Sequence, residues 1–445
     1  LTDGRHRYNF TQLYQAVLQL SFTISRKIEI TKETSAILIC DNTVNHILAF
    51  YAIQNLGIRL VLVNKKVHPA HLSKIISQQK PHCYLFTTDT GQLSMDGSLD
   101  INDLITNPGT KGEAFAVHLA KLIFPTSGTT GEPKLVEKRA GEFYWIRSFA
   151  DLLVKTKINK RRAVYISIPV SHGFGYTAVL FALILGKKAV VTDEKDQSRI
   201  TELILKEEAD LLAGVPASLN QLSENFKHVI HPIRTVISGG APLNETIFKN
   251  VTQVFGKEIF SIYGSTEASV SFIAGYTQLS QHVNALGRPL KGVKYRLASL
   301  PAGGYELLLQ SGLSNISTGN GWLHTGDLAA EDSKGNLVWC GRKDNMIIKN
   351  GVNIYPEEIE AALLRLPSIE DAYVKGEKDT RKGEIIIAIV KMKPGCYFTE
   401  SEIKESLKAT LPGIKIPDKI TKTDHFQYTS TGKKMTTRSV DENSN

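Results

Sequence analysis

A stretch rich in glycine and threonine, FPTSGTTGEPKL at residues 124–135, has the residue types that hold a phosphate group. Glycines let backbone N–H groups converge on an anion, and hydroxyls and a lysine add further donors and positive charge. The stretch is not a P-loop, G-x-x-x-x-G-K-[ST], because counting from Gly128 places Pro133 at the second glycine and Leu135 after Lys134. Proline has no N–H to donate, and leucine cannot bind magnesium. We therefore predict a phosphate-binding loop of another kind, with a plain surface turn as the alternative.

Five further segments with polar or charged residues follow along the chain. They are VISGGAP at residues 236–242, YGSTE at 263–267, HTGD at 324–327, GRKD at 341–344 continuing to KNGVNIYPEEIE at 349–360, and TSTGK at 429–433. Together with T-S-G-T-T-G-x-P-K, their order and spacing over about residues 35–435 resemble the adenylate-forming superfamily. That superfamily includes acyl-CoA synthetases, peptide-synthetase adenylation domains and luciferases. The resemblance departs at Leu135, where the family has a glycine.

The resemblance implies a two-step reaction that uses ATP, Mg²⁺ and coenzyme A. A carboxylate attacks the α-phosphate of ATP to give an acyl-adenylate and pyrophosphate, and a thiol then displaces AMP. Because two anions meet in the first step, the site needs positive charge at the transition state, and the resemblance assigns that charge to Lys433. Its neighbour Lys434 is the competing candidate. The resemblance places Thr266 against the α-phosphate and makes Glu267 the magnesium ligand.

The same resemblance assigns the nucleotide site. The glycine- and threonine-rich loop would hold the β- and γ-phosphates, the aromatic face of Tyr263 would stack on adenine, and Asp327 and Arg342 would bind the ribose hydroxyls. Taken singly, the aspartate of a T-G-D segment is more often a turn residue. The predicted nucleotide-binding residues are Thr126, Ser127, Gly128, Thr129, Thr130, Gly131, Lys134, Gly239, Gly240, Ala241, Tyr263, Gly264, Asp327 and Arg342.

The acid and the thiol are assigned to a separate group of residues. The segment PVSHGFGY at 169–176 resembles the family's substrate motif, and it lacks the aspartate with which amino-acid-activating relatives bind an α-amino group. We therefore expect a carboxylic acid without a nearby cation. His172 either lines the pocket or begins a helix, and Phe174 and Ser238 are further pocket candidates. By resemblance, Asp344 is the hinge of a rotating small domain, and Gly351 lines the thiol channel after rotation.

The elements that would position these residues alternate between short strands and helices as far as residue 262. A helix is expected at 46–56, where Gly57 ends the helical spacing of apolar residues. The expected strands are at 35–40, 59–63, 83–86, 163–168, 188–191, 210–214, 235–237 and 259–262. This alternation is typical of α/β architecture with parallel strands. From about Arg296 the pattern changes to short strands and turns, including 305–310 and 336–340.

The last hundred residues begin a new series of elements. Helices are expected at 357–366, opened by Pro356, and at 400–411, with strands at 369–375 and 383–392 between them. We predict a large AMP-binding N-terminal domain at 1–341, made of α/β subdomains and a small β-structured subdomain. A hinge at 342–344 and a small, mobile α+β C-terminal domain at 345–445 would follow.

The composition limits the partners and the compartment. The 445 residues carry a formal net charge of +9, which favours polyanions such as nucleotides or coenzyme A, with a solvated basic surface as the alternative. The sequence has no recognition motif for nucleic acid, so we expect no such partner. It has no apolar run long enough for a transmembrane segment and no signal-peptide pattern at residues 1–10. Four cysteines without metal-ligand spacing suit a cytoplasmic location.

These observations predict an AMP-forming acid–thiol ligase, specifically an acyl-CoA synthetase, with a place in fatty-acid metabolism. Two alternatives stay open. One is an adenylating enzyme that loads a carrier-protein thiol in place of coenzyme A. The other is a homologue that binds nucleotide or acyl-adenylate without turnover. The sequence indicates neither the chain length of the acid nor the oligomeric state.

Overall fold

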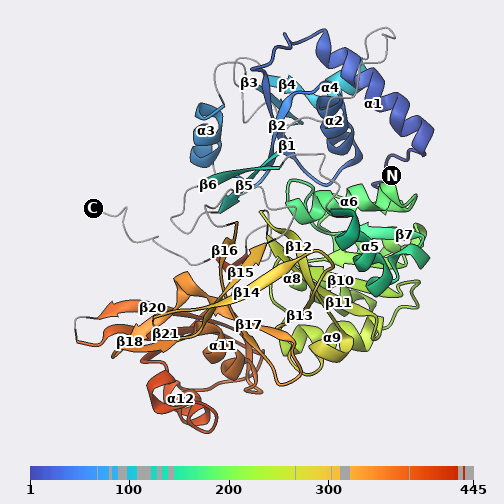
Figure 1. Cartoon of the computed structure of the whole chain (residues 1–445). Helices are drawn as coiled ribbons and strands as arrows, with labels where there is room; N and C mark the ends of the chain where they lie inside the picture. Colours follow the sequence, from blue (N-terminus) through green and yellow to red (C-terminus); the bar gives the residue numbers. More distant parts are fainter. Residues whose placement is uncertain are drawn as a thin grey trace.

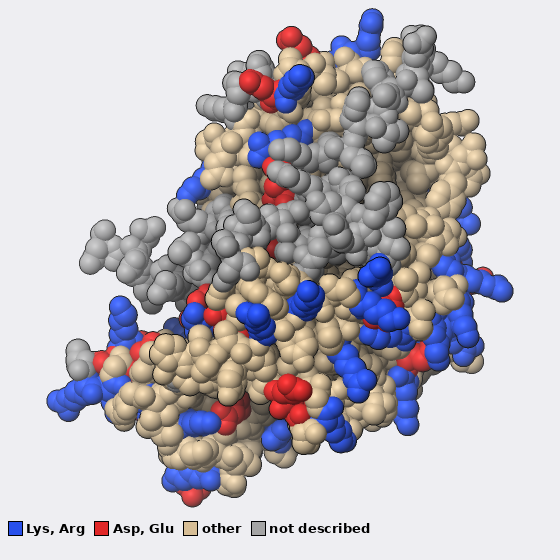
Figure 2. Space-filling model, viewed as in Figure 1, with Lys and Arg blue, Asp and Glu red and all other residues tan. Residues whose placement is uncertain are grey.

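The computed structural model describes residues 1–67, 69–79, 83–88, 98–107, 122–127, 133–138, 145–265, 267–301, 303–310, 321–379, 381–428 and 434–435. An N-terminal part, a central part and a smaller C-terminal part follow one another in space (Figure 1). The predicted fold class is confirmed: a large N-terminal α/β region with a β-structured portion precedes a small α+β region. On the face shown in Figure 2, Lys and Arg side chains are spread over several elements, with Asp and Glu between them. Among the described residues, no helix is long and apolar enough to cross a membrane.

The first sheet has six strands in the order β4-β3-β1-β2-β5-β6. Its strands are parallel except for the hairpin of β5 and β6. The strands are β1 (Ser35–Cys40), β2 (Arg59–Asn64), β3 (Cys83–Thr87), β4 (Ser98–Asp100), β5 (Leu122–Ser127) and β6 (Pro133–Lys138). The helices of this part are α1 (Phe10–Ser25), α2 (Val44–Asn55), α3 (Pro69–Ser77) and α4 (Ile101–Thr106).

Both faces of the first sheet are covered, which explains the unbroken apolar run of β1. Side chains alternate between the two faces of a strand. Leu38 and Cys40 therefore belong to the core on the α1 and α2 side, whereas Ile37 and Ile39 pack with residues of α3 on the other side. All six residues of β1 are buried. Continuous apolar strands of this kind are typical of parallel sheets covered on both faces.

The central sheet has eleven strands in the order β14-β15-β16-β17-β13-β12-β11-β10-β9-β7-β8. The strands are β7 (Ala163–Ile166), β8 (Lys188–Val190), β9 (Leu211–Gly214), β10 (Thr235–Gly239), β11 (Ile259–Ser265), β12 (Ser269–Gly275), β13 (Ala285–Pro289), β14 (Lys294–Ser299), β15 (Tyr305–Gln310), β16 (Leu323–Glu331) and β17 (Leu337–Arg342). The helices between or beside them are α5 (Trp145–Thr156), α6 (Gly173–Ile184), α7 (Gln197–Lys206), α8 (Pro216–Phe226), α9 (Glu245–Phe255) and α10 (Tyr276–Leu279), with a 3-10 helix at Ile158–Lys160.

Antiparallel pairing begins at β12, before the change to short strands and turns that is expected from about Arg296. Strands β7 to β11 are parallel, and β12 pairs antiparallel with β11 from Ser269. Only three residues, 266–268, separate β11 from β12, and a connection this short joins antiparallel neighbours only. This connection, Thr-Glu-Ala, contains neither glycine nor proline, the residues that mark turns most strongly, so the sequence gives little sign of it.

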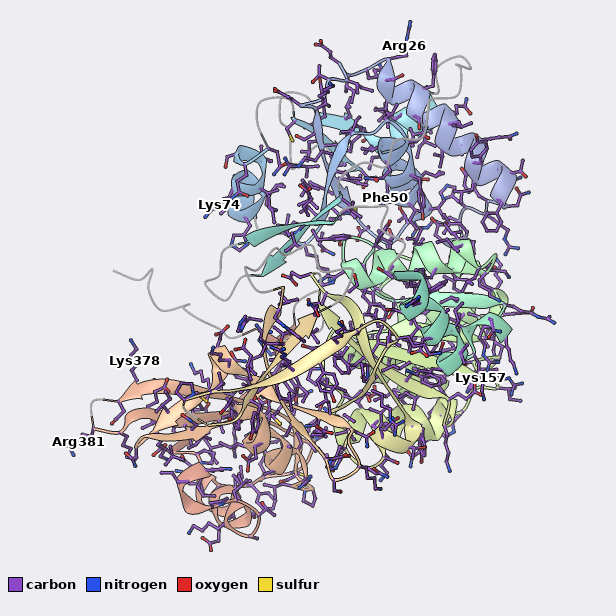
Figure 3. The ribbon with its side chains drawn as sticks, viewed as in Figure 1. Arg26, Phe50, Lys74, Lys157, Lys378 and Arg381 are labelled. Carbon is purple, nitrogen blue, oxygen red and sulfur yellow. The ribbon has the colours of Figure 1, made fainter. Side chains whose placement is uncertain are left out.

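The C-terminal part forms a third sheet of five strands. Its order is β19-β18-β21-β20, with β22 parallel to β21. The elements are β18 (Ile347–Lys349), β19 (Val352–Ile354), α11 (Pro356–Leu364), β20 (Ile369–Asp379), β21 (Gly383–Met392), α12 (Glu400–Lys408) and β22 (Lys419–Lys422), with 3-10 helices at Lys343–Asn345 and Gly413–Lys415 and a hairpin of β23 (Gln427–Tyr428) and β24 (Lys434–Met435). Figure 3 shows Lys378 and Arg381 at the outer end of this sheet. Both helices end two to three residues earlier than predicted, and the domain boundaries stay predictions.

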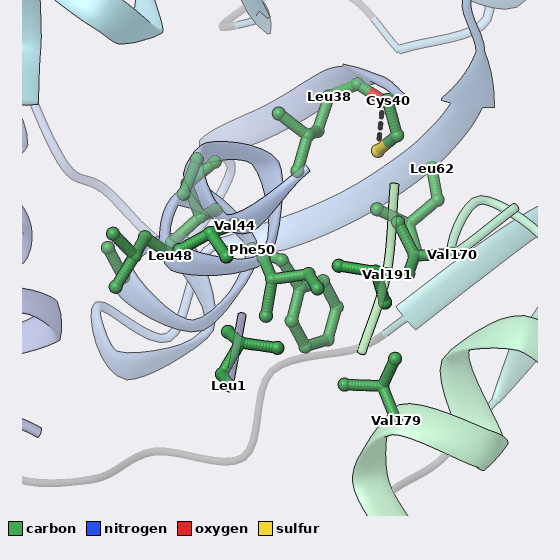
Figure 4. Close-up of a cluster of buried hydrophobic side chains, with 14 of the residues drawn as sticks. Leu1, Leu38, Cys40, Val44, Leu48, Phe50, Leu62, Val170, Val179 and Val191 are labelled. Atoms are coloured by element: carbon green, nitrogen blue, oxygen red, sulfur yellow. Dashed lines mark hydrogen bonds between the residues drawn. The ribbon is translucent and has the colours of Figure 1, made fainter. Parts of the chain in front are cut away.

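One hydrophobic core joins the first sheet to the central sheet. Leu38, Cys40 and Leu62 of the first sheet pack in the same cluster as Val170 and Val179, which lie before and within α6 (Figure 4). Asn42, which follows β1, strengthens this junction from both of its amide atoms. Its Nδ2 donates to the Ile168 carbonyl at 2.9 Å, and its Oδ1 accepts from the Val170 N–H at 2.8 Å. The segment that leads into α6 is therefore fixed to the first sheet.

Candidate active site

Five of the predicted nucleotide residues lie at the carboxyl ends of β10 and β11: Gly239, Gly240, Ala241, Tyr263 and Gly264. These strands are parallel, with Gly239 opposite Ile262, so Tyr263 and Gly264 lie beside the end of β10, where Gly240 and Ala241 follow. In open α/β sheets, ligands bind at this edge. Gly264 has a steric reason to be glycine, because a β-carbon there would overlap the backbone carbonyl oxygen of Ser269.

Tyr263, Asp327 and Arg342 form one hydrogen-bonded cluster on β11, β16 and β17. The Tyr263 hydroxyl donates to Asp327 Oδ2 at 2.6 Å, and Arg342 Nη1 donates to Asp327 Oδ1 at 3.3 Å. Asp327 and Arg342 are direct cross-strand partners of the antiparallel pair β16–β17. Arg342 Nη1 also donates to the Thr325 carbonyl at 3.0 Å. The structure thus brings together three residues that lie in three separate motifs of the sequence.

The Asp327 carboxylate retains a limited capacity for a ligand. Trp339 Nε1 donates to its Oδ1 at 3.1 Å, so three side chains already donate to the carboxylate. An ionised carboxylate accepts about four hydrogen bonds, which leaves about one for a hydroxyl group of a ligand. Burial and the negative charge of Asp327 raise the pKa of Tyr263 well above its usual value. Tyr263 therefore remains a neutral hydroxyl that donates to Asp327.

A second carboxylate, Glu306 on β15, contacts residues next to Asp327 and Arg342 in the chain. It is 4% exposed, and its oxygens accept from the Gly326 N–H at 3.3 Å and from Lys343 Nζ at 3.4 Å. His324 Nδ1 lies 3.3 Å from Glu306 Oε2. Burial alone would raise the pKa of Glu306, but His324, Lys343 and the Gly326 N–H lower it below its usual value. Glu306 therefore joins the HTGD segment to Lys343, which lies within the predicted hinge at 342–344.

The predicted acyl-pocket residues lie on the other side of the β10 end. A β-carbon on Gly239 would come within 2.8 Å of both Phe174 Cε1 and Ile262 Cγ1, so these apolar groups close around the glycine. The Ser238 side chain is fully buried, and its hydroxyl has no hydrogen-bond partner among the described residues. His172 is the N-cap residue of α6, but its side chain makes no capping hydrogen bond. Phe174 and Gly239 are thus brought together, whereas the side chain of Ser238, the preceding residue of β10, points to the opposite face of the sheet.

The phosphate and magnesium residues are described only in part. Thr266, Gly128, Thr129, Thr130, Gly131 and Lys433 lie outside the described residues, and only the backbone of Thr126, Ser127 and Lys134 is described. That backbone forms the β5–β6 hairpin, with Thr126 opposite Lys134. Leu135, the departure from the family pattern, packs against the core cluster of Ile37 and Val61. Glu267 is partly exposed in the turn before β12, and its carboxylate makes no hydrogen bond or ion pair within the described part of the chain. Its role as the magnesium ligand stays a prediction.

The predicted hinge lies directly after the cluster. Asp344 is the middle residue of the 3-10 helix Lys343–Asn345, and its Oδ2 lies 4.0 Å from Arg342 Nη2. Gly351, in contrast, is not brought to the cluster. It occupies the tip of the β18–β19 hairpin, and no described atom lies within 4 Å of the position of its β-carbon.

Comparisons with known proteins identify the family. The family model for AMP-binding enzymes matches residues 1–305, and the model for the C-terminal domain of AMP-binding enzymes matches residues 358–433. The chain belongs to the AMP-binding enzyme family. The predicted resemblance to the adenylate-forming superfamily is therefore confirmed.

Relatives of this AMP-binding enzyme match it over nearly its whole length. A 2-succinylbenzoate–CoA ligase of Staphylococcus aureus (strain bovine RF122 / ET3-1) is 26% identical, over 97% of this chain and 95% of the relative. The structure of the Bacillus subtilis o-succinylbenzoate CoA synthetase MenE with an acyl-adenylate intermediate has a TM-score of 0.83 at 22% identity, over 97% of this chain and 93% of that one. The amide bond synthetase McbA from Marinactinospora thermotolerans has a TM-score of 0.83 at 20% identity, over 97% and 94% of the two chains.

Sequence reasoning missed Glu306 and Trp339 in this AMP-binding enzyme. Glu306 and Gly326 are 20 residues apart, and their contact depends on the register of the β15–β16 pair. Trp339 contacts Asp327 across the β16–β17 hairpin, 12 residues away. Neither residue belongs to a motif singled out in the sequence. A predicted antiparallel hairpin could have indicated both residues, because facing residues of such a hairpin lie close together and contact each other.

The small domain contacts the large region next to the hinge through Glu357. This residue lies in the first turn of α11, and its side chain occupies the space where a β-carbon on Gly341 would lie. Oε2 of Glu357 is buried without a hydrogen-bond partner among the described residues. Burial raises the pKa of Glu357 from 4.5 to about 7, and the negative charge of Glu360 adds to that increase.

Substitution of Glu357 by glutamine is expected to change the pH dependence of stability. The folded protein binds the Glu357 proton more tightly than the unfolded chain, so the wild type loses stability as the pH rises from 4.5 to about 7. The glutamine of Glu357→Gln stays neutral at every pH. At about pH 8 the free energy of unfolding of this variant should therefore exceed that of the wild type by roughly 1–3 kcal/mol, with little difference near pH 4. Thermal unfolding across this range measures the difference. Glu358→Gln, a more exposed carboxylate of the same turn, is the control, and identical pH profiles for Glu357→Gln and the wild type would contradict the prediction.

Proposed function

We propose that this chain is an AMP-forming acid–coenzyme A ligase. It activates a carboxylic acid with ATP and Mg²⁺ to an acyl-adenylate, releases pyrophosphate, and transfers the acyl group to coenzyme A. The observation that carries the proposal is the Tyr263–Asp327–Arg342 cluster, which lies at the carboxyl edge of the sheet and directly before a candidate hinge. The similarity to a 2-succinylbenzoate–CoA ligase over 97% of the chain supports this class of reaction.

The nucleotide would lie across the ends of β10 and β11. The ring of Tyr263 would stack on adenine, and the glycines at 239 and 240, which have no side chain, would let the backbone come close to it. Asp327 and Arg342 would bind the ribose hydroxyls. Glu267 is the proposed magnesium ligand, because a hard cation beside a phosphate prefers carboxylate oxygen. A solved relative, the B. subtilis MenE with ATP and magnesium ion, has a TM-score of 0.83 to this chain at 23% identity, over 97% of this chain and 94% of that one. The shared fold supports ATP and magnesium as ligands of this chain.

The acid would lie against Phe174, Ile262 and Gly239. These groups form an apolar wall. An acid with an apolar body fits this wall. The relative's substrate, 2-succinylbenzoate, has an aromatic ring and further oxygen atoms, so aromatic and keto acids are the first candidates. No comparison supports a role in fatty-acid metabolism, and saturated fatty acids serve as the contrasting substrates.

Pyrophosphate release with a panel of acids tests the proposal. The panel holds 2-succinylbenzoate, other aromatic acids and aliphatic acids of increasing length, each with ATP and Mg²⁺. Mass spectrometry with coenzyme A or with a phosphopantetheinylated carrier protein then identifies the thiol acceptor. Pyrophosphate release followed by an acyl-CoA product supports the proposal. ATP binding without release for any acid would instead favour a non-catalytic binding protein, and a product on the carrier alone would favour the carrier-loading enzyme.

Substitution of Asp327 by alanine is expected to weaken the use of ATP. The ribose hydroxyls lose a charged acceptor, and a hydrogen bond to a charged group contributes about 1.5–3 kcal/mol. The kcat/KM for ATP should therefore fall about ten- to a hundredfold, which pyrophosphate release measures. Glu331→Gln, on the exposed end of the same strand, should leave kcat/KM unchanged. An Asp327→Ala enzyme with normal kcat/KM for ATP would remove Asp327 from the proposed ribose site.

A further inference from the structure

Asp418, directly before β22, is bound by two lysines from different parts of the small domain. Its Oδ2 lies 2.7 Å from Lys349 Nζ at the end of β18, and its Oδ1 lies 2.7 Å from Lys382 Nζ in the turn before β21. The Ile386 N–H of β21 donates to Oδ2 at 2.9 Å. Burial alone would raise the pKa of Asp418, but these hydrogen bonds lower it to about 2. One ionised carboxylate thus joins three segments.

The segment joined through Lys349 is the tip of the β18–β19 hairpin. Asn350 and Gly351 form its two-residue turn, with φ of 51° and 75°, which is the conformation of the type I′ turn that Asn-Gly favours. The Asn350 N–H donates to the Lys382 carbonyl at 2.8 Å. Both lysines that bind Asp418 therefore adjoin the same turn. Lys349 precedes the turn in the chain, and the backbone carbonyl of Lys382 accepts the hydrogen bond from the N–H of Asn350 in the turn.

The hairpin tip has exposed apolar side chains beside it. Ile348 is 45% exposed and Val352 is 43% exposed, although both lie on strands of a sheet. β19 is an edge strand, and the turn lies beside Lys382, next to Arg381 at the outer end of the small domain (Figure 3). Apart from its chain neighbours, no described atom lies within 4 Å of where a β-carbon on Gly351 would be, and the hydrogen bond of the turn to Lys382 stays within the small domain. The order of the tip therefore depends on the small domain alone.

We propose that Asp418 is a positioning residue for the transfer of the acyl group to the thiol. The carboxylate, through Lys349 and Lys382, holds the Asn350–Gly351 turn rigid while the turn is exposed. When the small domain rotates about residues 342–344, the rigid tip enters the thiol side of the site, and Ile348 and Val352 are covered by the large domain. The inference rests on the proposed function, because it assigns Asp418 to the second half-reaction only.

The geometry favours this role over general support of the small domain. The core of that domain is apolar and includes Ile359, Leu363 and Ile403, whose side chains pack without a contribution from Asp418. Asp418 instead binds the two lysines that border one turn. A small displacement of a group that orients a reactant can lower a rate by about a hundredfold. The loss is expected only in the step that uses the turn.

Asp418→Asn tests the inference, with Glu370→Gln as the matched control. Glu370 binds Lys391 on the β20–β21 pair at 2.6 Å, so this variant also removes a carboxylate from a lysine of the same sheet. Asp418→Asn should release pyrophosphate at the wild-type rate in the presence of acid and ATP. Transfer from pre-formed acyl-adenylate to coenzyme A should fall about ten- to a hundredfold. Glu370→Gln should match the wild type in both steps.

Lys382→Gln and amide hydrogen exchange keep the test decisive if Asp418→Asn folds poorly. The Lys382 side chain is 45% exposed, so its substitution places little strain on the fold, and it should lower transfer in the same selective way. In both variants the peptide that contains Asn350 should exchange faster than in the wild type. Normal transfer and unchanged exchange in well-folded variants would overturn the inference. If the wild type itself releases no pyrophosphate with any acid, the proposed function fails, and the exchange experiment alone decides whether Asp418 orders the turn.

Discussion

Lys433→Ala should lower the rate of adenylate formation by at least about a thousandfold, because a carboxylate and the α-phosphate of ATP are both anions and repel each other without a cation between them. The T-x-x-G-K register assigns that cation to Lys433, which lies outside the described residues. Transfer from supplied acyl-adenylate to coenzyme A should be spared, since the phosphate bond that needs the lysine has already formed. Pyrophosphate release and acyl-CoA formation measure the two steps separately.

Lys434→Ala provides the matched control for this prediction. Lys434 is the next residue, and its backbone pairs with Tyr428 in the β23–β24 hairpin. It carries the same charge and is the next residue in the chain, so its substitution reproduces the change in charge without removing the proposed catalytic group. Equal loss of both steps in Lys433→Ala would contradict its role in adenylation. A loss of adenylation in Lys434→Ala, with normal activity in Lys433→Ala, would transfer the role to Lys434.

The sequence predicted the strands of the fold better than its helices. The apolar runs at 35–40 and 59–63 became β1 and β2, because a strand buried on both faces has few polar residues. Helix α1 was not predicted, since its face toward solvent and its face toward the core both contain polar residues, and Ser21 and Thr23 are buried. Its capping box, Asn9 with Gln12, was the signal that could have located it.

The candidate site was predicted where its residues belong to short motifs. Tyr263, Asp327 and Arg342 were named from three motifs, and the structure joins them by hydrogen bonds. The partners that hold these residues could not be named in the same way. Trp339 contacts Asp327 only because β16 and β17 pair with a register shift between Leu328 and Ala329, and the sequence does not specify that shift. The predicted roles of the site residues await the kinetic tests.

Asp344→Pro should separate the two half-reactions. Asp344 is the second residue of the 3-10 helix Lys343–Asn345, and the first N–H groups of a helix have no acceptor within it. The φ of proline, near −65°, lies within the range of such a turn, so the present arrangement should persist and adenylation should be largely retained. Rotation of the small domain requires a different backbone angle at the hinge, which proline prevents. Transfer to coenzyme A should therefore fall about a hundredfold in a single-turnover measurement.

Asp344→Ala distinguishes a fixed backbone from a lost side chain. Alanine removes the carboxylate near Arg342 as proline does, but it leaves φ free. If the backbone is what matters, Asp344→Ala should transfer the acyl group far faster than Asp344→Pro. If both variants lose transfer equally, the carboxylate itself is needed, and the hinge assignment has to move to a neighbour such as Lys343. Loss of adenylation alone in Asp344→Pro would refute the assignment, because the present arrangement of Arg342 and Asp327 would then depend on a flexible residue 344.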